Sequence, residues 1–228
     1  MNLYAIGDLH LSLAGDKPMD VFGDRWSGHT EKLKNAFASV ETEDVVVICG
    51  DISWGMSLEE SIEDFRFIHS LPGRKIILKG NHDYWWTTMS KMNAFLAKNG
   101  FDSISIMNNN SFLYEDKAVC GTRGWFFEEE TGGAHDRKIL LREVGRLRAS
   151  LESAGDREKL VFLHYPPIYR DYRCPEIMEL LREYGVRLCC YGHIHGKGLY
   201  GAFNGWTNGC EYRCVSADAV DFTPVKIL

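Results

Sequence analysis

Residues 74–83 read Arg74-Lys75-Ile76-Ile77-Leu78-Lys79-Gly80-Asn81-His82-Asp83, a short apolar run followed at once by a polar cluster. A run of this length is typical of a strand that is buried on both faces. In α/β proteins, ligands collect beyond the carboxyl ends of such strands. The glycine before the cluster lets the chain turn sharply and lets the backbone approach a ligand closely. The segment therefore predicts a strand of an α/β protein that leads directly into a functional site.

Four further polar clusters follow apolar runs in the same way. Strands are predicted over residues 2–7, 44–49, 74–79, 159–163 and 187–191. The further clusters are Gly7-Asp8-Leu9-His10, Gly50-Asp51, Leu163-His164-Tyr165 and Gly192-His193-Ile194-His195. Because ligands gather at the carboxyl ends of strands in an α/β sheet, we expect all five clusters to converge in one place.

Segments with helical spacing of apolar residues separate these strands. They cover residues 30–40, 57–70, 136–153 and 175–184. Alternating strands and helices predict α/β layers. Residues 103–121 and 198–227 instead predict short strands, with Asn204-Gly205 and Asn208-Gly209 as hairpin turns. We expect a mixed sheet, or two packed sheets with helices outside, in one domain over residues 1–228.

The composition favours a soluble globular protein. The chain has 228 residues, of which 45% are hydrophobic and 25% charged, and no segment approaches the roughly 18 consecutive apolar residues of a membrane helix. The N-terminus lacks the basic region of a signal peptide. Seven irregularly spaced cysteines predict free thiols in the cytoplasm. A net charge of −6 argues against binding to nucleic-acid backbone, and the oligomeric state stays open.

The five clusters hold the residue types that a site for two metal ions requires. Carboxylate and imidazole together suit Mn, Fe or Zn. Asp8 and His10 alternate with Leu9, so an extended segment would point both side chains to one side. The candidate ligands are Asp8, His10, Asp51, Asn81, His164, His193 and His195. This set fills two metal sites if one carboxylate bridges the ions.

Each cluster taken alone has an ordinary explanation. A histidine after a strand is more often a hydrogen-bonded core residue than a ligand, and Asn and Asp favour turns. Five of the eight histidines, however, fall within the five clusters, and every cluster follows a predicted strand. This joint pattern favours the metal site over five separate coincidences.

These clusters, from Asp8 to His195, resemble those of the calcineurin-like metallophosphoesterase superfamily in type and order. The resemblance implies a four-layer α/β/β/α sandwich of mixed sheets, with two divalent ions at the carboxyl ends of the strands. It implies that the first ion is held by Asp8, His10, Asp51 and His195, and the second by Asp51, Asn81, His164 and His193. Asp51 would bridge the ions, and His82 would lie beside the leaving group.

The second cluster departs from one branch of that superfamily. The protein serine/threonine phosphatases continue it as Gly-Asp-x-x-Asp-Arg-Gly, whereas this chain has Gly50-Asp51-Ile52-Ser53-Trp54-Gly55. The second aspartate and the phosphate-binding arginine are missing, which puts protein phosphatase activity in doubt. The chain looks more like the small bacterial members, which include phosphodiesterases and phosphomonoesterases.

The expected mechanism needs no serine or cysteine nucleophile. Two ions roughly 3.5–4 Å apart lower the pKa of a bridging water, and the resulting hydroxide attacks the phosphate in line. We predict that His82 is the general acid for the leaving group. Asp83 would either orient His82 or another imidazole, or cap a following helix.

Two loops, over residues 11–29 and 122–135, are expected to shape the substrate pocket. The candidate substrate-binding residues are Trp26, His29 and Arg123. The guanidinium of Arg123 suits bidentate binding of phosphate, although it could instead pair with one of the glutamates at 128–130. Tyr84-Trp85-Trp86 is either a platform for stacking bases or, as we favour, part of the core.

The sequence thus predicts hydrolysis of a phosphomonoester or phosphodiester of a small metabolite or nucleotide. A nuclease is the enzymatic alternative, because DNA-repair nucleases of the superfamily share these clusters, but the chain is acidic and has no basic domain. A catalytically inactive scaffold is the alternative of another class. The presence of all candidate ligands and of His82 argues against it.

Overall fold

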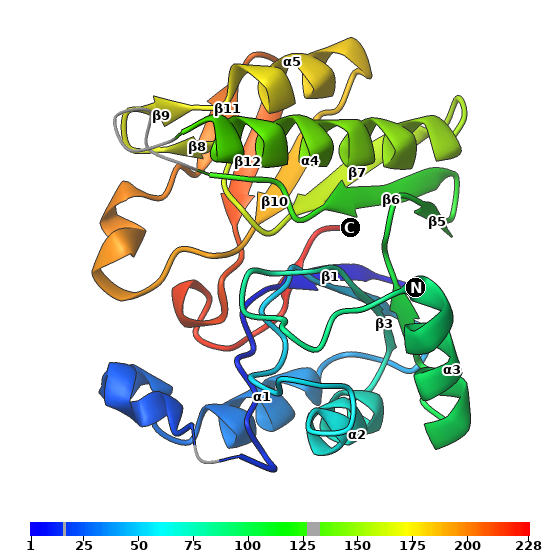
Figure 1. Ribbon diagram of the computed structural model, residues 1–228, viewed down its shortest axis with the longest axis vertical. Helices are drawn as coiled ribbons and strands as arrows, with labels where there is room; N and C mark the ends of the chain where they lie inside the picture. Colours follow the sequence, from blue (N-terminus) through cyan, green and yellow to red (C-terminus); the bar gives the residue numbers. More distant parts are fainter. Residues whose placement is uncertain (16, 127–132) are drawn as a thin grey trace.

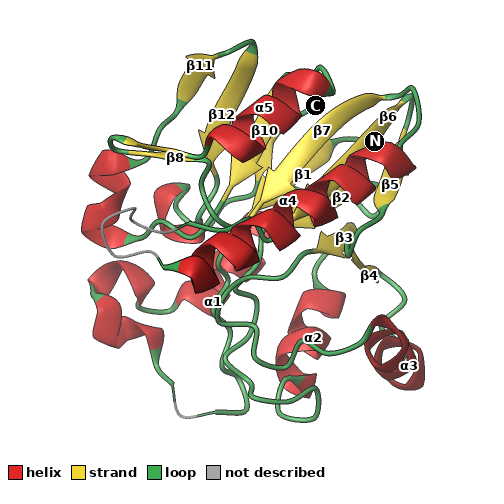
Figure 2. Ribbon diagram, turned by 45° about the horizontal axis from the view of Figure 1, so that its top comes forward, coloured by secondary structure: helices red, strands yellow, loops and turns green. Residues whose placement is uncertain are grey.

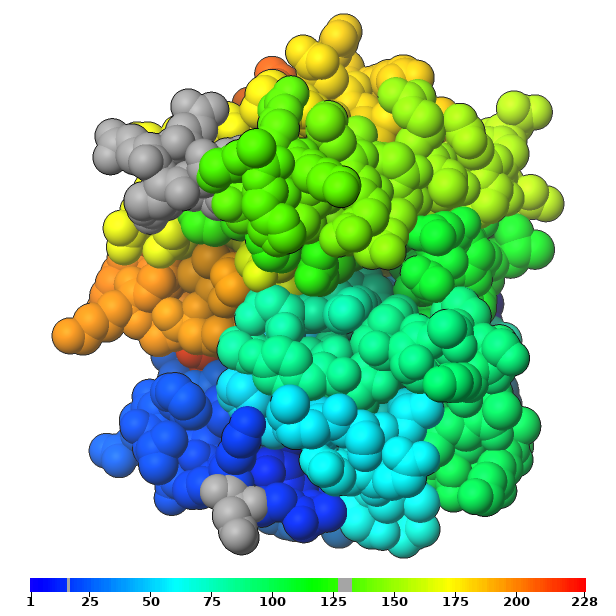
Figure 3. Space-filling view, viewed as in Figure 1, coloured from blue at the N-terminus to red at the C-terminus, as the bar shows by residue number. Residues whose placement is uncertain are grey.

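Two β-sheets packed face to face form the centre of this protein in a computed structural model that describes residues 1–15, 17–126 and 133–228. Helices cover the outer face of each sheet, which gives four layers (Figure 1). The expected α/β/β/α sandwich is therefore confirmed. In Figure 3 the first hundred residues or so form the lower half of the molecule, and most of the following residues form the upper half.

The first sheet has the strand order β13-β1-β2-β3-β4. Its four parallel strands are β1 (Leu3–Ile6), β2 (Val45–Ile48), β3 (Arg74–Ile77) and β4 (Ile104–Ile106). The short strand β13 (Val225–Lys226) pairs with β1 in the antiparallel direction. Every residue of β2 is buried, as expected for a strand covered on both faces.

The second sheet has the strand order β11-β12-β10-β7-β6-β5. Its four parallel strands are β6 (Lys117–Thr122), β7 (Glu158–Leu163), β10 (Leu188–Tyr191) and β12 (Cys210–Cys214). The antiparallel edge strands are β5 (Ser111–Tyr114) and β11 (Gly205–Thr207). A separate ribbon pairs β8 (Ile168–Tyr169) with β9 (Tyr172–Arg173).

Within the described ranges, five α-helices lie on the two outer faces. The first sheet is covered by α1 (His29–Phe37), α2 (Ile62–Ser70) and α3 (Met89–Asn99), and the second by α4 (Ala134–Ser153) and α5 (Pro175–Glu183) (Figure 2). Short 3-10 helices occur at η1 (Met19–Phe22), η2 (Asp24–Trp26), η3 (Gly196–Gly201) and η4 (Ala217–Ala219). Within the described residues, none of the helices has the length and apolar character needed to cross a bilayer.

The helix predictions are confirmed for four segments, with two differences. Helix α2 begins at Ile62 rather than at residue 57, because the preceding residues form turns. Helix α3 was not among the predicted ranges, and it begins where the hydroxyl of Thr88 accepts a hydrogen bond from the Lys91 amide.

The two predicted hairpin turns have different outcomes. Asn208-Gly209 joins β11 to β12, and both residues have positive φ, 51° and 78°, as the tight hairpin turn requires. Asn204-Gly205 forms no hairpin turn, because Gly205 is already the first residue of β11 and pairs with Tyr212.

The inner faces of both sheets form one apolar layer. Val47 and Ile76 from the first sheet share a buried cluster with Phe162 and Cys190 from the second. This layer holds the two sheets together, so that the carboxyl ends of their parallel strands meet at one edge of the sandwich.

Candidate metal centre

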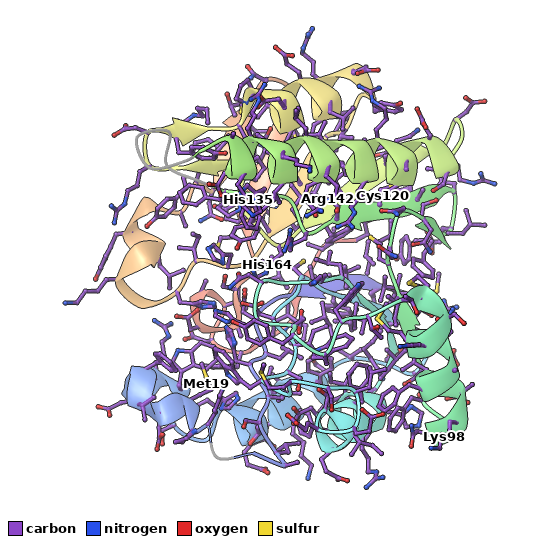
Figure 4. All side chains as sticks on the ribbon, viewed as in Figure 1. Met19, Lys98, Cys120, His135, Arg142 and His164 are labelled. Carbon is purple, nitrogen blue, oxygen red and sulfur yellow. The ribbon has the colours of Figure 1, made fainter. Side chains whose placement is uncertain are left out.

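The five polar clusters converge at the carboxyl ends of β1, β2, β3, β7 and β10. Figure 4 places His164 between the two halves of the sandwich. The donor atoms form two groups, each with its ligand atoms within 4.8 Å of one another: Asp8 with His10 and His195, and Asp51 with His164 and His193. Each group contains residues from both sheets, so the centre spans the interface between them.

The carboxylate of Asp51 lies between the two groups. Its Oδ2 atom is 3.6 Å from His164 Nε2 and 3.8 Å from His10 Nε2. Asn81 adjoins the second group, because its Oδ1 atom lies 2.7 Å from His164 Nε2. This placement is what a carboxylate that bridges two ions requires.

Hydrogen-bond acceptors at Nδ1 orient the imidazoles of His164 and His195. His164 Nδ1 lies 3.0 Å from the carbonyl oxygen of Cys49, which can only accept, so Nδ1 carries the proton and Nε2 faces Asp51. His195 Nδ1 lies 2.9 Å from Oδ1 of the buried Asp218. This turns His195 Nε2 toward Asp8 Oδ1 at 3.4 Å.

Asp218 is the residue of the centre that the sequence analysis missed. It lies in η4, shortly after the end of β12, and its Oδ2 also accepts a hydrogen bond from the Gly196 amide. The sequence signal that could have indicated Asp218 is its position shortly after the strand β12, where polar residues again follow a strand. It went unrecognised because residues 198–227 were interpreted only as hairpins.

Four candidate ligands have left-handed backbones. The φ angles are 61° at Asp8, 45° at His10, 50° at Asp51 and 73° at His193. The expected extended geometry of the Asp8–His10 segment is therefore wrong, although both side chains reach the centre. Such conformations cost about 1–3 kcal/mol each and persist only where surrounding bonds enforce them. Here the Asp8 amide donates to Gly50 O and the His10 amide to Asp51 O, both at 2.9 Å.

Two glycines allow the carboxylates of Asp8 and Asp51 to lie directly against the backbone. A Cβ atom at Gly192 would stand 2.5 Å from Asp8 Oδ2. A Cβ atom at Gly80 would overlap Asp51 Oδ1. Any larger residue at either position would push a carboxylate out of its place.

The electrostatics of the donor set fit divalent cations. Burial, and then the charge of Asp8, raises the pKa of Asp51 to about 8. Burial lowers the pKa of His195, but Asp8 and Asp218 outweigh it and raise that pKa to about 10. Burial, and then His164, lowers the pKa of His193 to about 3, which leaves the neutral imidazole that a metal ligand must be. Two buried carboxylates that lie close enough for the charge of one to raise the pKa of the other and of a neighbouring imidazole favour positive charge at this centre, which two divalent ions would supply.

His82 lies beside this donor set. Its amide donates to Asp51 Oδ1 at 2.7 Å, and its ring lies 4.5 Å from that of Trp54 between centroids. The Tyr84 hydroxyl is 3.4 Å from His82 Nδ1. Burial, and then His164, lowers the pKa of His82. An anionic group close to the ring would raise this pKa and so favour the protonated imidazole.

Asp83 shows neither of its two expected arrangements. Its Oδ2 accepts the amides of Asp51 and Gly80 at 2.9 and 2.7 Å, and its Oδ1 accepts the Ile52 amide and the Trp85 indole at 2.8 and 3.0 Å. These donors occupy both oxygens, and the following helix has Thr88 as its cap. Asp83 therefore ties the second cluster to the third by their backbones.

An apolar pocket of about 360 Å³ opens at the centre. Its lining consists of His10, Met19, Phe22, Trp26, Trp54, His82, His195 and Gly196. Trp26 is therefore in the pocket, as the sequence analysis expected. His29 lies behind Trp26, with 5.5 Å between ring centroids, and does not line the pocket.

The other expected substrate residues lie farther away. Arg123 pairs with Glu143 at 3.2 Å and does not line the pocket at the centre, while the glutamates at 128–130 lie outside the described residues. Trp85 is buried in the core, as favoured from the sequence. Tyr84 is 51% exposed.

A model of the calcineurin-like phosphoesterase family matches residues 1–197. The chain belongs to this family. The family implies divalent metals, and the two donor groups of this chain could hold such ions.

Two bacterial relatives carry the names of phosphodiesterases. One, from Coxiella burnetii, is named as a probable cyclic nucleotide phosphodiesterase; it is 23% identical over 74% of this calcineurin-like chain and 68% of its own length. The other, a glycerophosphodiester phosphodiesterase from Enterobacter lignolyticus, is 26% identical over 74% of this chain and 58% of its own length. Together with the family, they support phosphoester hydrolysis as the activity of this chain.

Solved structures share the fold. A protein of unknown function from Aquifex aeolicus has a TM-score of 0.52 and 19% identity, and the match covers 99% of this chain and 95% of that one. A protein from Thermus thermophilus has a TM-score of 0.50 and 12% identity, with 86% and 82% covered. At these identities the likeness concerns the fold alone.

Proposed function

We propose that this chain is a phosphodiesterase that uses two divalent ions, with Mn, Fe and Zn as the candidates, on a small diester that carries an apolar or aromatic group. A nucleotide is the leading substrate class. The observation that carries the proposal is the position of Asp51 between two donor groups beside an apolar pocket.

The chain's own residues have separate tasks in this proposal. Asp8 and Asp51 anchor one donor group each, and Asp218 and the Cys49 carbonyl hold two imidazoles in orientation. Bound ions would supply an activated water as nucleophile and positive charge for the phosphoryl group. His82, whose ring borders the pocket, donates a proton to the leaving oxygen.

The pocket supports the choice of substrate. Apart from imidazoles, its described lining carries no ionisable side chain, and Trp26 and Trp54 belong to its apolar part, which suits a planar apolar group. The names of the two relatives favour a diester over a monoester.

The test uses bis(4-nitrophenyl) phosphate and 4-nitrophenyl phosphate with chelated protein to which Mn²⁺, Fe²⁺ or Zn²⁺ is returned. We expect activity only with metal and a higher kcat/KM for the diester. Trp54→Ala should lower kcat/KM for the aryl diester about tenfold, a typical cost of losing an aromatic contact. Trp206→Ala, at a 59% exposed position on β11, is the matched control and should change nothing. Equal effects of both substitutions, or hydrolysis without metal, would count against the proposal.

The cytoplasm is the proposed location. All seven cysteines are free and buried, which supports a reducing compartment. Immunodetection in fractionated cells would test this, and recovery outside the cytoplasmic fraction would contradict it.

A further inference from the structure

A second cavity, of about 150 Å³, lies outside the apolar pocket of the metal centre. Three cationic side chains from three segments line it: Lys79 after β3, Arg123 after β6 and Arg146 on α4. Thr122, Asn108 and the buried Glu143 complete the polar lining. We call this cavity the basic pocket.

Positive charge exceeds negative charge in the basic pocket. The Glu143 carboxylate accepts from Thr122 Oγ1 at 2.8 Å, Arg123 Nη2 at 3.2 Å and Arg146 Nη1 at 2.7 Å. The basic pocket therefore holds three cations and one carboxylate, and this carboxylate pairs with two of the three. In the described part of the chain, no carboxylate lies within ion-pair distance of the Lys79 ammonium. The local balance favours an additional anion.

The guanidinium of Arg123 has donors to spare. It carries five N–H groups, and its bond in the described part of the chain is the one from Nη2 to Glu143. Its Nε atom is buried and has no acceptor among the described residues, and the side chain as a whole is only 14% exposed. The ring of Trp125 supports the group at 4.8 Å. An incompletely bonded guanidinium that is held in place suits an oxyanion, which accepts several hydrogen bonds at once.

The basic pocket borders the metal centre without being part of it. Lys79 directly precedes the Gly80-Asn81 segment. The carbonyl oxygen of Arg123 accepts the amides of His164 and Tyr165 at 3.2 and 2.8 Å. None of the candidate metal ligands is among its described lining residues.

We propose that the basic pocket binds a small oxyanion, of the chemistry shared by phosphate, sulfate and carboxylate groups. Its volume leaves room for one such group. The anion is either a free ion or a second acidic group of the substrate. The inference goes beyond the proposed phosphodiesterase activity, because the binding requires no hydrolysis.

Calorimetric titration of the metal-loaded protein with inorganic phosphate tests the proposal directly. We expect two binding events, one at the metal centre and one in the basic pocket. Lys79→Gln and Arg146→Gln should each weaken one event about tenfold or more and leave the other unchanged, since each removes a hydrogen bond to a charged group. Thermal denaturation of each variant checks that it is folded.

The matched control is Arg142→Gln. Arg142 lies on the same helix as Arg146, beside Glu143, but it is exposed and outside the basic pocket (Figure 4). The control should retain both binding events. A single event in the unmodified protein, or equal weakening by Arg142→Gln, overturns the proposal whether or not the protein hydrolyses diesters.

Kinetics separates the two sources of the anion. The substrates are bis(4-nitrophenyl) phosphate and a nitrophenyl phosphodiester whose second alcohol ends in a carboxylate. If the basic pocket takes the substrate's own acidic group, Lys79→Gln should raise KM for the carboxylate ester about tenfold more than for the plain ester. If a free ion binds instead, the KM ratio of the esters should not change, while the calorimetric event is still weakened.

Discussion

Asp51 is the residue on which most of the candidate centre depends. Its side chain faces both donor groups, its amide is held by Asp83, and a glycine makes room for its carboxylate. The left-handed backbone at Asp51 shows that side-chain type alone would not place these oxygens. At the residue scale, backbone geometry and side-chain chemistry act together.

Asp51→Asn should remove more metal than the loss of any single histidine. A bridging carboxylate serves both ions, whereas each imidazole serves one, and an amide has no negative charge to offer. Elemental analysis after gel filtration should show loss of metal at both sites. His10→Ala is the comparison, and it should retain one ion. Equal metal content in the two variants would contradict a bridging role.

His82→Ala should lower kcat and keep the metal content. If His82 donates a proton to the leaving oxygen, the loss should be about 10²–10⁴-fold for an alkyl leaving group and small for nitrophenolate, which departs without help. A matched pair of alkyl and nitrophenyl diesters measures the difference. Equal losses on both esters would show that His82 acts through phosphate binding or support of the metals.

At the scale of elements, the parallel strands determine where the centre lies. In each sheet, the central parallel strands end at the same edge, and the loops that follow them carry the donors. The helices form the outer layers, and contacts at their ends hold the strands in place. One such contact joins the end of α2 to β3.

Lys75 in β3 is buried and holds the end of α2 through its ammonium. The Nζ atom donates to the carbonyl oxygens of Leu71, Gly73 and His69 at 2.6, 2.7 and 3.4 Å. Lys75→Met keeps the apolar stem but leaves these carbonyls without their donor, so we expect a loss of about 1–3 kcal/mol in the free energy of unfolding. Urea denaturation measures the change.

The control for Lys75 is Lys98→Met on α3, where the lysine is exposed (Figure 4). A surface substitution of this kind should change stability by no more than about 0.5 kcal/mol. If Lys75→Met is as mild as the control, the buried ammonium contributes no net stability to this junction.

For the whole molecule, the candidate centre connects the two halves of the sandwich. Asp8, His10 and Asp51 follow strands of the first sheet, and His164 and His195 follow strands of the second. The apolar layer between the sheets brings these ends together. Ions that bind both halves would therefore stabilise the folded chain over the unfolded one.

Removal of metal should lower the melting temperature of the whole protein. Binding at 100 times the dissociation constant contributes about 2.7 kcal/mol per site, because the unfolded chain does not present the ligands together. Calorimetric scans with chelator and with returned metal should differ by several degrees. Asp51→Asn should lose most of this difference, and an unchanged difference in that variant would place the stabilising ions elsewhere.

The sequence by itself determined the strands that carry the centre and the candidate ligands that follow them. Apolar runs such as 44–49 and 187–191 form strands because each run is apolar enough to be buried on both faces, and this property is local. The polar clusters that follow these strands lie at one edge of the sandwich, because parallel strands of a sheet have their carboxyl ends on the same side. The family match over residues 1–197 confirms the resemblance that these clusters suggested.

Only the tertiary structure decided which distant groups support these residues. Asp218 reaches His195, Asp83 collects amides from the second cluster, and Glu143 pairs with Arg123. No local pattern encodes these contacts, because the partners lie on loops and a helix far apart in the chain. They meet because the apolar layer between the sheets fixes the two halves against each other, and because a buried polar group is more stable when it has a hydrogen-bond partner.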